Sequence, residues 1–87
     1  MDEIRVIARA LAREGKEEQL RNTLVGMLAP TRAEQGCRLY ELYESNKRRL
    51  FFFYEEWESQ DVLDRRTKTP HYKQLVQNVR DLLEGAF

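Results

Sequence analysis

The sequence of 87 residues is poor in several residue types and has no excess of charge. It contains one cysteine, one histidine, two prolines and four glycines, and fifteen basic side chains balance fifteen acidic ones. Proteins that bind nucleic acids usually carry a basic excess that neutralises phosphates, so this balance argues against such a partner. No apolar run approaches the roughly 20 residues needed to cross a bilayer, and the first residues lack the pattern of a signal peptide.

Cysteine and histidine are too few for the common metal sites. Cys37 has no second cysteine for an internal disulfide, which fits the reducing cytoplasm, and the chain offers no ligand spacing typical of zinc or non-haem iron. A phosphate-binding glycine loop and a dinucleotide fingerprint are also absent. We therefore expect a cytoplasmic protein without a metal, a cofactor or a membrane partner.

The residues that are present favour one small folded domain over residues 1–87. Charged residues make up 34% of the chain, apolar residues 41% and aromatic residues 10%, which is enough apolar material for an ordered core. A domain of this length buries only about 60% of the surface of its unfolded chain, so association would help to stabilise it.

Hydrophobic periodicity predicts the order β-α-β-β-α-α. Alternating apolar residues predict strands over residues 4–11, 37–45 and 49–57, and a polar turn at 46–48 joins the last two into an antiparallel hairpin. The third strand is apolar on both faces, as in a strand that is buried on both sides. Because the few helices can cover only one face, and an exposed aromatic face would be sticky, we predict a homodimer in which two sheets face each other.

Apolar side chains at three- and four-residue spacing predict the helices. The first runs over residues 17–35, is kinked or restarted at Pro30, and ends at Gly36 in the left-handed conformation. Ser59 and Thr69 are the expected N-caps of two further helices, and a proline follows Thr69 at the first helical position.

Five segments carry a family resemblance through their order and spacing. They are Ala8-Arg9 with Gly15-Lys16, Ala29-Pro30-Thr31-Arg32, Glu34-Gln35-Gly36-Cys37 leading to Tyr40-Glu41-Leu42, Tyr54-Glu55-Glu56-Trp57-Glu58-Ser59, and Thr69-Pro70-His71-Tyr72. With these segments the chain resembles the antibiotic biosynthesis monooxygenase family over nearly its whole length. The resemblance implies a ferredoxin-like α+β fold, βαββα(α)β, with an antiparallel sheet, helices on one of its faces, and a dimeric α+β barrel.

The resemblance also bears on the last strand of the fold. Family members usually continue into a fourth strand that completes the sheet, and we expect this strand to be short or missing in the residues up to Phe87. Since an exposed sheet edge invites unwanted pairing, we expect the chain to continue beyond this point.

The resemblance implies a cofactor-independent monooxygenase that acts on a small aromatic substrate, such as a quinol or polyphenol, with dioxygen. Haem degradation is not expected, because the Asn, Trp and His of that branch correspond here to Ala8, Arg66 and Val76. The Asn of the anthrone oxygenases corresponds to Phe53. Two alternatives stay open: an isomerase of a small phosphorylated carbonyl compound, with Lys73 at the phosphate, and a non-enzymatic dimeric module that binds a small hydrophobic ligand.

Two side chains are candidate proton acceptors. His71 lies in the first turn of the last predicted helix, in a segment that borders the cavity by resemblance, and is otherwise a surface histidine. Glu55 shares a strand face with large apolar groups, where desolvation raises the pKa of a carboxyl. The alternative for Glu55 is a structural ion pair with Arg9 or Arg38.

The candidate substrate-binding residues are aromatic. They are Trp57, Phe53, Tyr40 and Tyr72. Ordinary core packing is the alternative for each of them. The basic pair Arg65-Arg66 has acidic neighbours at Asp61 and Asp64, which favours solvated ion pairs over the binding of an anionic substrate.

Overall fold

The elements of the fold follow one another in the predicted order, with the first helix divided in two. The computed structural model describes residues 3–45 and 49–85, and the turn predicted at 46–48 lies outside them. The elements are β1 (Ile4–Leu11), α1 (Glu17–Val25), α2 (Leu28–Arg32), β2 (Cys37–Glu44), β3 (Leu50–Trp57), α3 (Gln60–Arg66) and α4 (Pro70–Arg80). No helix in the described ranges is long and apolar enough to span a membrane.

Three antiparallel strands form one sheet in the order β1-β3-β2, with β3 in the centre. Side chains along β3 alternate between buried and half-buried positions, because successive side chains of a strand point to opposite faces of the sheet. Its buried row consists of Phe51, Phe53, Glu55 and Trp57. A slip of one residue in the pairing would turn this row to the opposite face, so the apolar pattern fixes the register.

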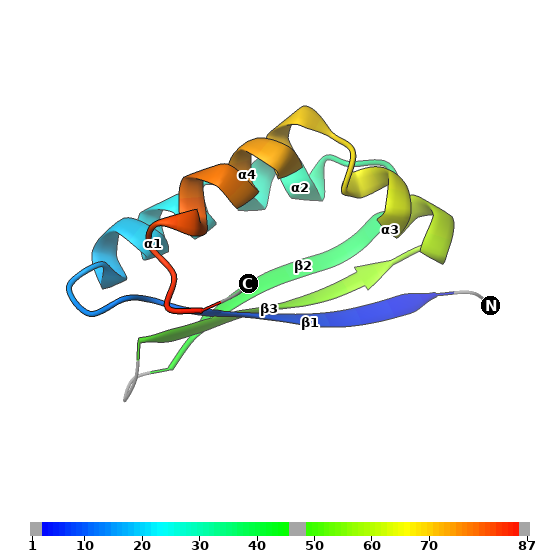
Figure 1. The fold of residues 1–87 in the computed structure, drawn as a ribbon. Helices are drawn as coiled ribbons and strands as arrows, with labels where there is room; N and C mark the ends of the chain where they lie inside the picture. The colour runs from blue at the N-terminus through cyan, green and yellow to red at the C-terminus, as the bar shows by residue number, and fades with distance from the viewer. Residues whose placement is uncertain (1–2, 46–48, 86–87) are drawn as a thin grey trace.

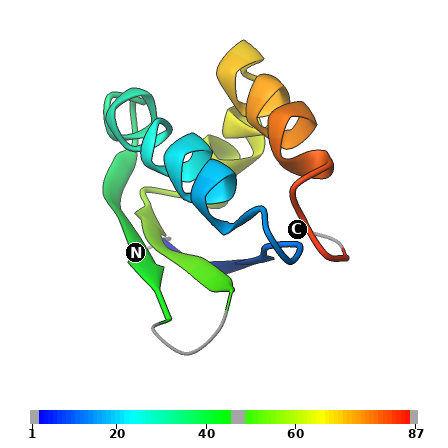
Figure 2. The same cartoon turned by 90° about the vertical axis from the view of Figure 1, so that its left-hand side faces the viewer.

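The helices cover one face of the sheet (Figure 1). In the turned view α1 and α4 lie side by side above the strands (Figure 2), and they contact each other directly. Their inner faces bury Leu20, Leu24, Leu75 and Val79. The core therefore lies between the helices and the buried row of β3, which confirms the predicted α+β fold with helices on one face.

The first predicted helix is interrupted earlier than expected. We placed the interruption at Pro30, but α1 ends at Val25, α2 begins at Leu28, and Pro30 lies inside α2. A proline ring clashes with the carbonyl of the residue four positions earlier, here Gly26, and has no N–H to donate to it. The chain therefore breaks next to Gly26, and the proline occupies the first turn of the following helix, where its missing N–H is tolerated.

The starts of α3 and α4 are fixed by the predicted caps. The Ser59 hydroxyl accepts from the Val62 N–H at 3.2 Å, and the Thr69 hydroxyl accepts from the Tyr72 N–H at 3.3 Å. Gly36 has a φ of +91°, and a Cβ atom there would lie 2.6 Å from Val62 Cγ1. Glycine at this position therefore lets α3 pack closely against the start of β2.

The second face of the sheet carries no helix within the described residues. We call it the open sheet face, and its large apolar side chains include Ile7, Tyr43, Leu50, Phe52 and Tyr54, with the charged residues Arg5, Arg9, Glu41 and Glu56 beside them. Ile7 is 66% exposed, Tyr43 is 45% exposed, and the rings of Tyr43 and Phe52 stack with centroids 5.4 Å apart. Contiguous apolar area of this kind is typical of an interaction surface.

The segment after α4 returns to the outer edge of β1. Ala12 and Leu83 form an antiparallel bridge, and the Glu84 N–H donates to the Leu11 carbonyl at 2.7 Å. Within the described residues, the last strand, which was expected to be short or missing, is reduced to this single bridge.

Candidate functional site

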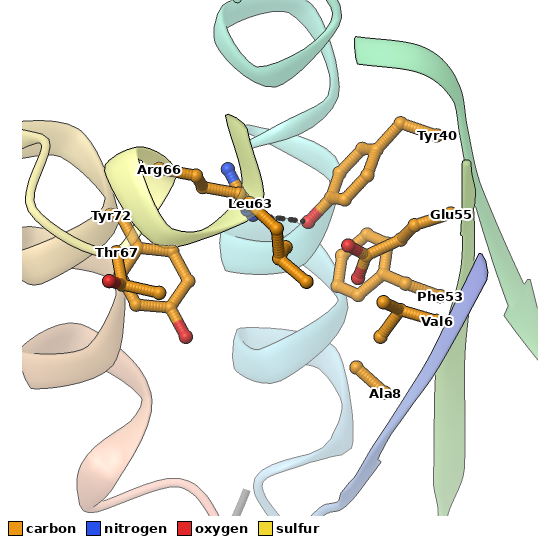
Figure 3. A pocket seen from close by; sticks show the side chains of 9 residues that line it. All are labelled: Val6, Ala8, Tyr40, Phe53, Glu55, Leu63, Arg66, Thr67 and Tyr72. Atoms are coloured by element: carbon orange, nitrogen blue, oxygen red, sulfur yellow. Dashed lines mark hydrogen bonds between the residues drawn. The ribbon is translucent and has the colours of Figure 1, made fainter. Parts of the chain in front are cut away.

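A small pocket lies between the sheet and helices α3 and α4, with a volume of about 100 Å³ (Figure 3). The sheet contributes Val6, Ala8, Tyr40, Phe53 and Glu55. The helical side contributes Leu63, Arg66, Thr67 and Tyr72. An engineered protein cavity of about 150 Å³ binds benzene, so this pocket is on the scale of one aromatic ring.

Glu55 is the buried carboxyl group of the pocket. It leaves the centre of β3 opposite Tyr40 on β2 and Val6 on β1, and it is 5% exposed. The Trp57 Nε1–H donates to Glu55 Oε1 at 2.8 Å. Burial raises the pKa of Glu55 above its usual range, while the Trp57 hydrogen bond and the charge of Arg66 act against this shift. Glu55 therefore takes up a proton more readily than an exposed carboxylate does.

Tyr40 forms one wall of the pocket and holds a neighbouring group in place. Its ring stacks on Phe53 with centroids 4.5 Å apart, and its hydroxyl accepts a hydrogen bond from Arg66 Nη2 at 3.1 Å. Burial raises the pKa of Tyr40 far above its usual range. Tyr40 therefore stays neutral and does not serve as a base.

Arg66 brings a positive charge to the pocket. It is 4% exposed, and its Nη1 donates to Glu34 Oε2 at 2.8 Å and to Thr31 Oγ1 at 3.4 Å. Its guanidinium carbon also lies within 4.8–5.2 Å of three aromatic ring centroids. These rings belong to Tyr40, Trp57 and Tyr72. The charge is thus held rigidly in an aromatic cage.

His71 lies in the first turn of α4 but does not line the pocket. Its Nε2 forms a hydrogen bond with Glu34 Oε2, the same oxygen that accepts from Arg66. The side chain is 34% exposed. Tyr72, the next residue along α4, lines the pocket instead. His71 is therefore connected with the pocket through Glu34 and Arg66.

The structure brings four of the six predicted site residues together in one pocket. They are Glu55, Phe53, Tyr40 and Tyr72. Trp57 is fully buried and binds Glu55 without lining the pocket, and His71 lies outside it. The alternative ion pair of Glu55 with Arg9 or Arg38 is wrong, because both arginines are exposed and the partner is Trp57.

Arg66 is the charged pocket residue that the sequence did not predict, and Val6, Ala8, Leu63 and Thr67 are the other pocket residues outside the predicted set. A solvated ion pair with Asp61 or Asp64 was favoured, but Arg66 is buried and its partner is Glu34. The signal that points to the observed position is the four-residue spacing from Val62, which places both side chains on the inner face of α3.

Among the described residues, no group of three His, Cys, Asp or Glu side chains is arranged to hold a metal ion.

Comparison with known proteins shows to which family the chain belongs. A family model described as antibiotic biosynthesis monooxygenase matches residues 3–78. The chain belongs to this family. Membership agrees with the family resemblance and the α+β fold expected from the sequence.

Two known proteins are similar to this chain over most of their length. The Mycobacterium tuberculosis protein named "Putative monooxygenase Rv0793" is 40% identical over 80 residues, which are 92% of this chain and 79% of that protein. The solved structure of Rv0793 has a TM-score of 0.91 at 38% identity, covering 97% of this chain and 86% of that one. The crystal structure of PA3566 from Pseudomonas aeruginosa has a TM-score of 0.91 at 30% identity, covering 98% and 87%.

Proposed function

We propose that this family member is a cofactor-independent monooxygenase that oxidises a small phenolic substrate of the quinol type with dioxygen. The observation that carries the proposal is Glu55, a carboxyl group buried among aromatic side chains in a pocket on the scale of one ring. Its raised pKa makes it a stronger proton acceptor than an exposed carboxylate. Membership of the antibiotic biosynthesis monooxygenase family supports the class of reaction.

The proposed reaction begins when the phenolic hydroxyl passes its proton to a carboxylate oxygen of Glu55. The electron-rich phenolate then gives an electron to dioxygen, and the two radicals combine into a peroxide on a ring carbon. Loss of water from this peroxide, with the proton returned from Glu55, leaves a carbonyl. One quinol and one dioxygen thus give one hydroxyquinone and one water, and the protein contributes orientation, a proton acceptor and exclusion of bulk water.

The size of the pocket narrows the substrate class. Its volume is about 100 Å³. Pockets for drug-sized ligands usually measure about 300–1,000 Å³. The stacked rings of Tyr40 and Phe53 offer a flat wall against which one aromatic ring can lie. A single-ring quinol therefore suits this pocket better than a polycyclic anthrone.

Oxygen uptake tests the proposal directly. We expect single-ring quinols to consume oxygen faster with the protein than in a protein-free blank. The Glu55→Gln variant should lose about 10²-fold or more of this rate, the usual contribution of a general base. Glu58→Gln, which changes the exposed carboxylate just after β3, is the matched control and should keep the rate.

Other outcomes of the oxygen assay would refute the proposal. Oxygen uptake that never exceeds the blank for any quinol or anthrone would favour the non-enzymatic module that binds a small hydrophobic ligand. Turnover of a phosphorylated carbonyl compound in the absence of oxygen would favour the isomerase.

We also propose that a second copy of the chain covers the open sheet face. Ile7 and Tyr43 are the most exposed large apolar side chains of this face, and a small domain gains stability when such area is buried. Light scattering should give the mass of a dimer, and Ile7→Glu should give a monomer. Val25→Glu is the control, because Val25 is 49% exposed on α1, on the helical side. A wild-type protein of strictly monomeric mass would refute the dimer.

A further inference from the structure

Arg66 is a cation buried in the wall of the pocket, where its surroundings must stabilise its charge. Arg66 is 4% exposed, and its guanidinium carbon lies 4.8 Å from the Tyr72 ring centroid and 5.1 Å from that of Trp57. A guanidinium removed from water is stable only where counter-charges and hydrogen bonds compensate for its lost hydration. The partners of Arg66 therefore determine what charge the pocket presents to a ligand.

The charged and titratable groups around Arg66 come from three sides. They are Glu34 in the α2–β2 connection, Cys37 and Tyr40 on β2, Glu55 on β3, and His71 and Tyr72 on α4. Tyr40 is neutral because burial raises its pKa. Glu34 accepts with one oxygen, Oε2, from both Arg66 and His71. The carboxylate bound to Arg66 is therefore shared with a second donor.

Glu55 is the second carboxyl group within reach of this charge. The charge of Arg66 lowers the pKa of Glu55, but burial has the larger effect, so the net shift favours the protonated acid. When Glu55 holds a proton, Arg66 is the one charged side chain among the residues that line the pocket, because its carboxylate partner Glu34 does not line it. A ligand that brings one negative charge would then be stabilised by Arg66 at short range.

We propose that this pocket binds single-ring phenols as their phenolate anions, and that Arg66 makes it selective for the anion. The inference rests on the proposed function, because the same phenolate is the electron donor to dioxygen. In that reaction Arg66 stabilises the negative charge that remains when the phenolic proton moves to Glu55. The two groups face the pocket from opposite sides, Glu55 from β3 and Arg66 from α3 (Figure 3).

Binding of para-nitrophenol tests this inference without any turnover. Its phenolate is yellow and its neutral form is not, so the absorption spectrum reports the charge of the bound ring. A pH titration in the presence of saturating protein should give an apparent pKa at least about one unit below that of the free probe, which is a tenfold preference for the anion. Nitrobenzene, which lacks the hydroxyl group, should displace the probe at least about tenfold less effectively than colourless single-ring phenolates do.

Variants on α3 separate the charge of Arg66 from its packing. Arg66→Met should return the apparent pKa of the bound probe to its free value, and Arg66→Lys, which keeps the charge, should retain part of the shift. Arg65→Met changes the exposed neighbour on the same helix and should retain the whole shift. If Arg66→Met does not fold, the wild-type spectrum and Arg66→Lys decide the question.

Three results would overturn the inference. They are the absence of saturable binding, a bound probe in the neutral form, and an Arg66→Met variant that folds and keeps the full shift. Displacement of the probe by inorganic phosphate would assign the site to a phosphorylated ligand and would overturn it as well. A protein that binds phenolate through Arg66 but consumes no oxygen with any quinol would refute the oxygenase and leave anion selection by Arg66 in place.

Discussion

The ion pair between Arg66 and Glu34 offers a quantitative test of how the site is built. The side chains are 4% and 12% exposed, and the Nη1 to Oε2 distance is 2.8 Å. Glu34→Gln leaves a buried guanidinium without its carboxylate, and removal of one partner from a buried pair costs about 3–5 kcal/mol. Because Glu34 keeps some contact with solvent, we expect the lower end, about 3 kcal/mol.

Replacement of the other partner, Arg66, should lower the free energy of unfolding by less. Arg66→Met leaves Glu34 with His71 as its second partner and puts an apolar side chain of similar length into the aromatic cage. The loss is then that of hydrogen bonds to a charged group, about 2 kcal/mol. The double variant, which buries neither charge, should also lose about 2 kcal/mol rather than the sum of about 5 kcal/mol.

Equilibrium unfolding in urea measures these values, with all variants at one protomer concentration because association shifts apparent stability. A loss of about 3 kcal/mol corresponds to a fall in Tm of about 12–24 °C for a domain of this size. Single-variant losses that add up to the double-variant loss within about 0.5 kcal/mol would refute the coupling between Arg66 and Glu34.

Two further predictions concern single positions. Glu55→Gln keeps an oxygen for the Trp57 N–H and removes the ionisation. Because the folded-state pKa of Glu55 is raised, wild-type stability falls as pH rises from the ordinary value of 4.5 through the folded value. The difference between the two urea midpoints should therefore change across this pH range and stay constant below it and above it. Gly36→Ala forces alanine into the left-handed region and brings its Cβ against Val62, so we expect a loss of at least about 2 kcal/mol in the same assay, and a variant as stable as the wild type would contradict the strain.

Much of the fold was predictable because its signals are local. Alternation along β3 identifies the buried row, and the hydroxyls of Ser59 and Thr69 cap the helices that follow them. The break between α1 and α2 was misplaced, because a proline disturbs the carbonyl four residues earlier more than its own position. The signal was present in Pro30, but its effect falls at Gly26.

Part of the site was predictable because strand alternation determines it. Phe53 and Glu55 share a face of β3 by spacing alone. The contacts of Arg66 and His71 with Glu34 join residues 32 and 37 positions apart, and they depend on how α3 and α4 pack over the sheet. The spacing from Val62 indicates only that Arg66 faces inward, and no local pattern encodes the contacts of Arg66 and His71 with Glu34.

Labelled dioxygen tests the central claim, that this pocket oxygenates a phenolic ring, most directly. The protein and its Glu55→Gln variant are incubated in parallel with a single-ring quinol under dioxygen enriched in the heavy isotope, and the products are examined by mass spectrometry. We expect one heavy oxygen atom in the product of the wild type, formed at a rate that falls about 10²-fold or more in the variant. A product without the label, or equal labelling rates for the wild type, the variant and a protein-free blank, would contradict it.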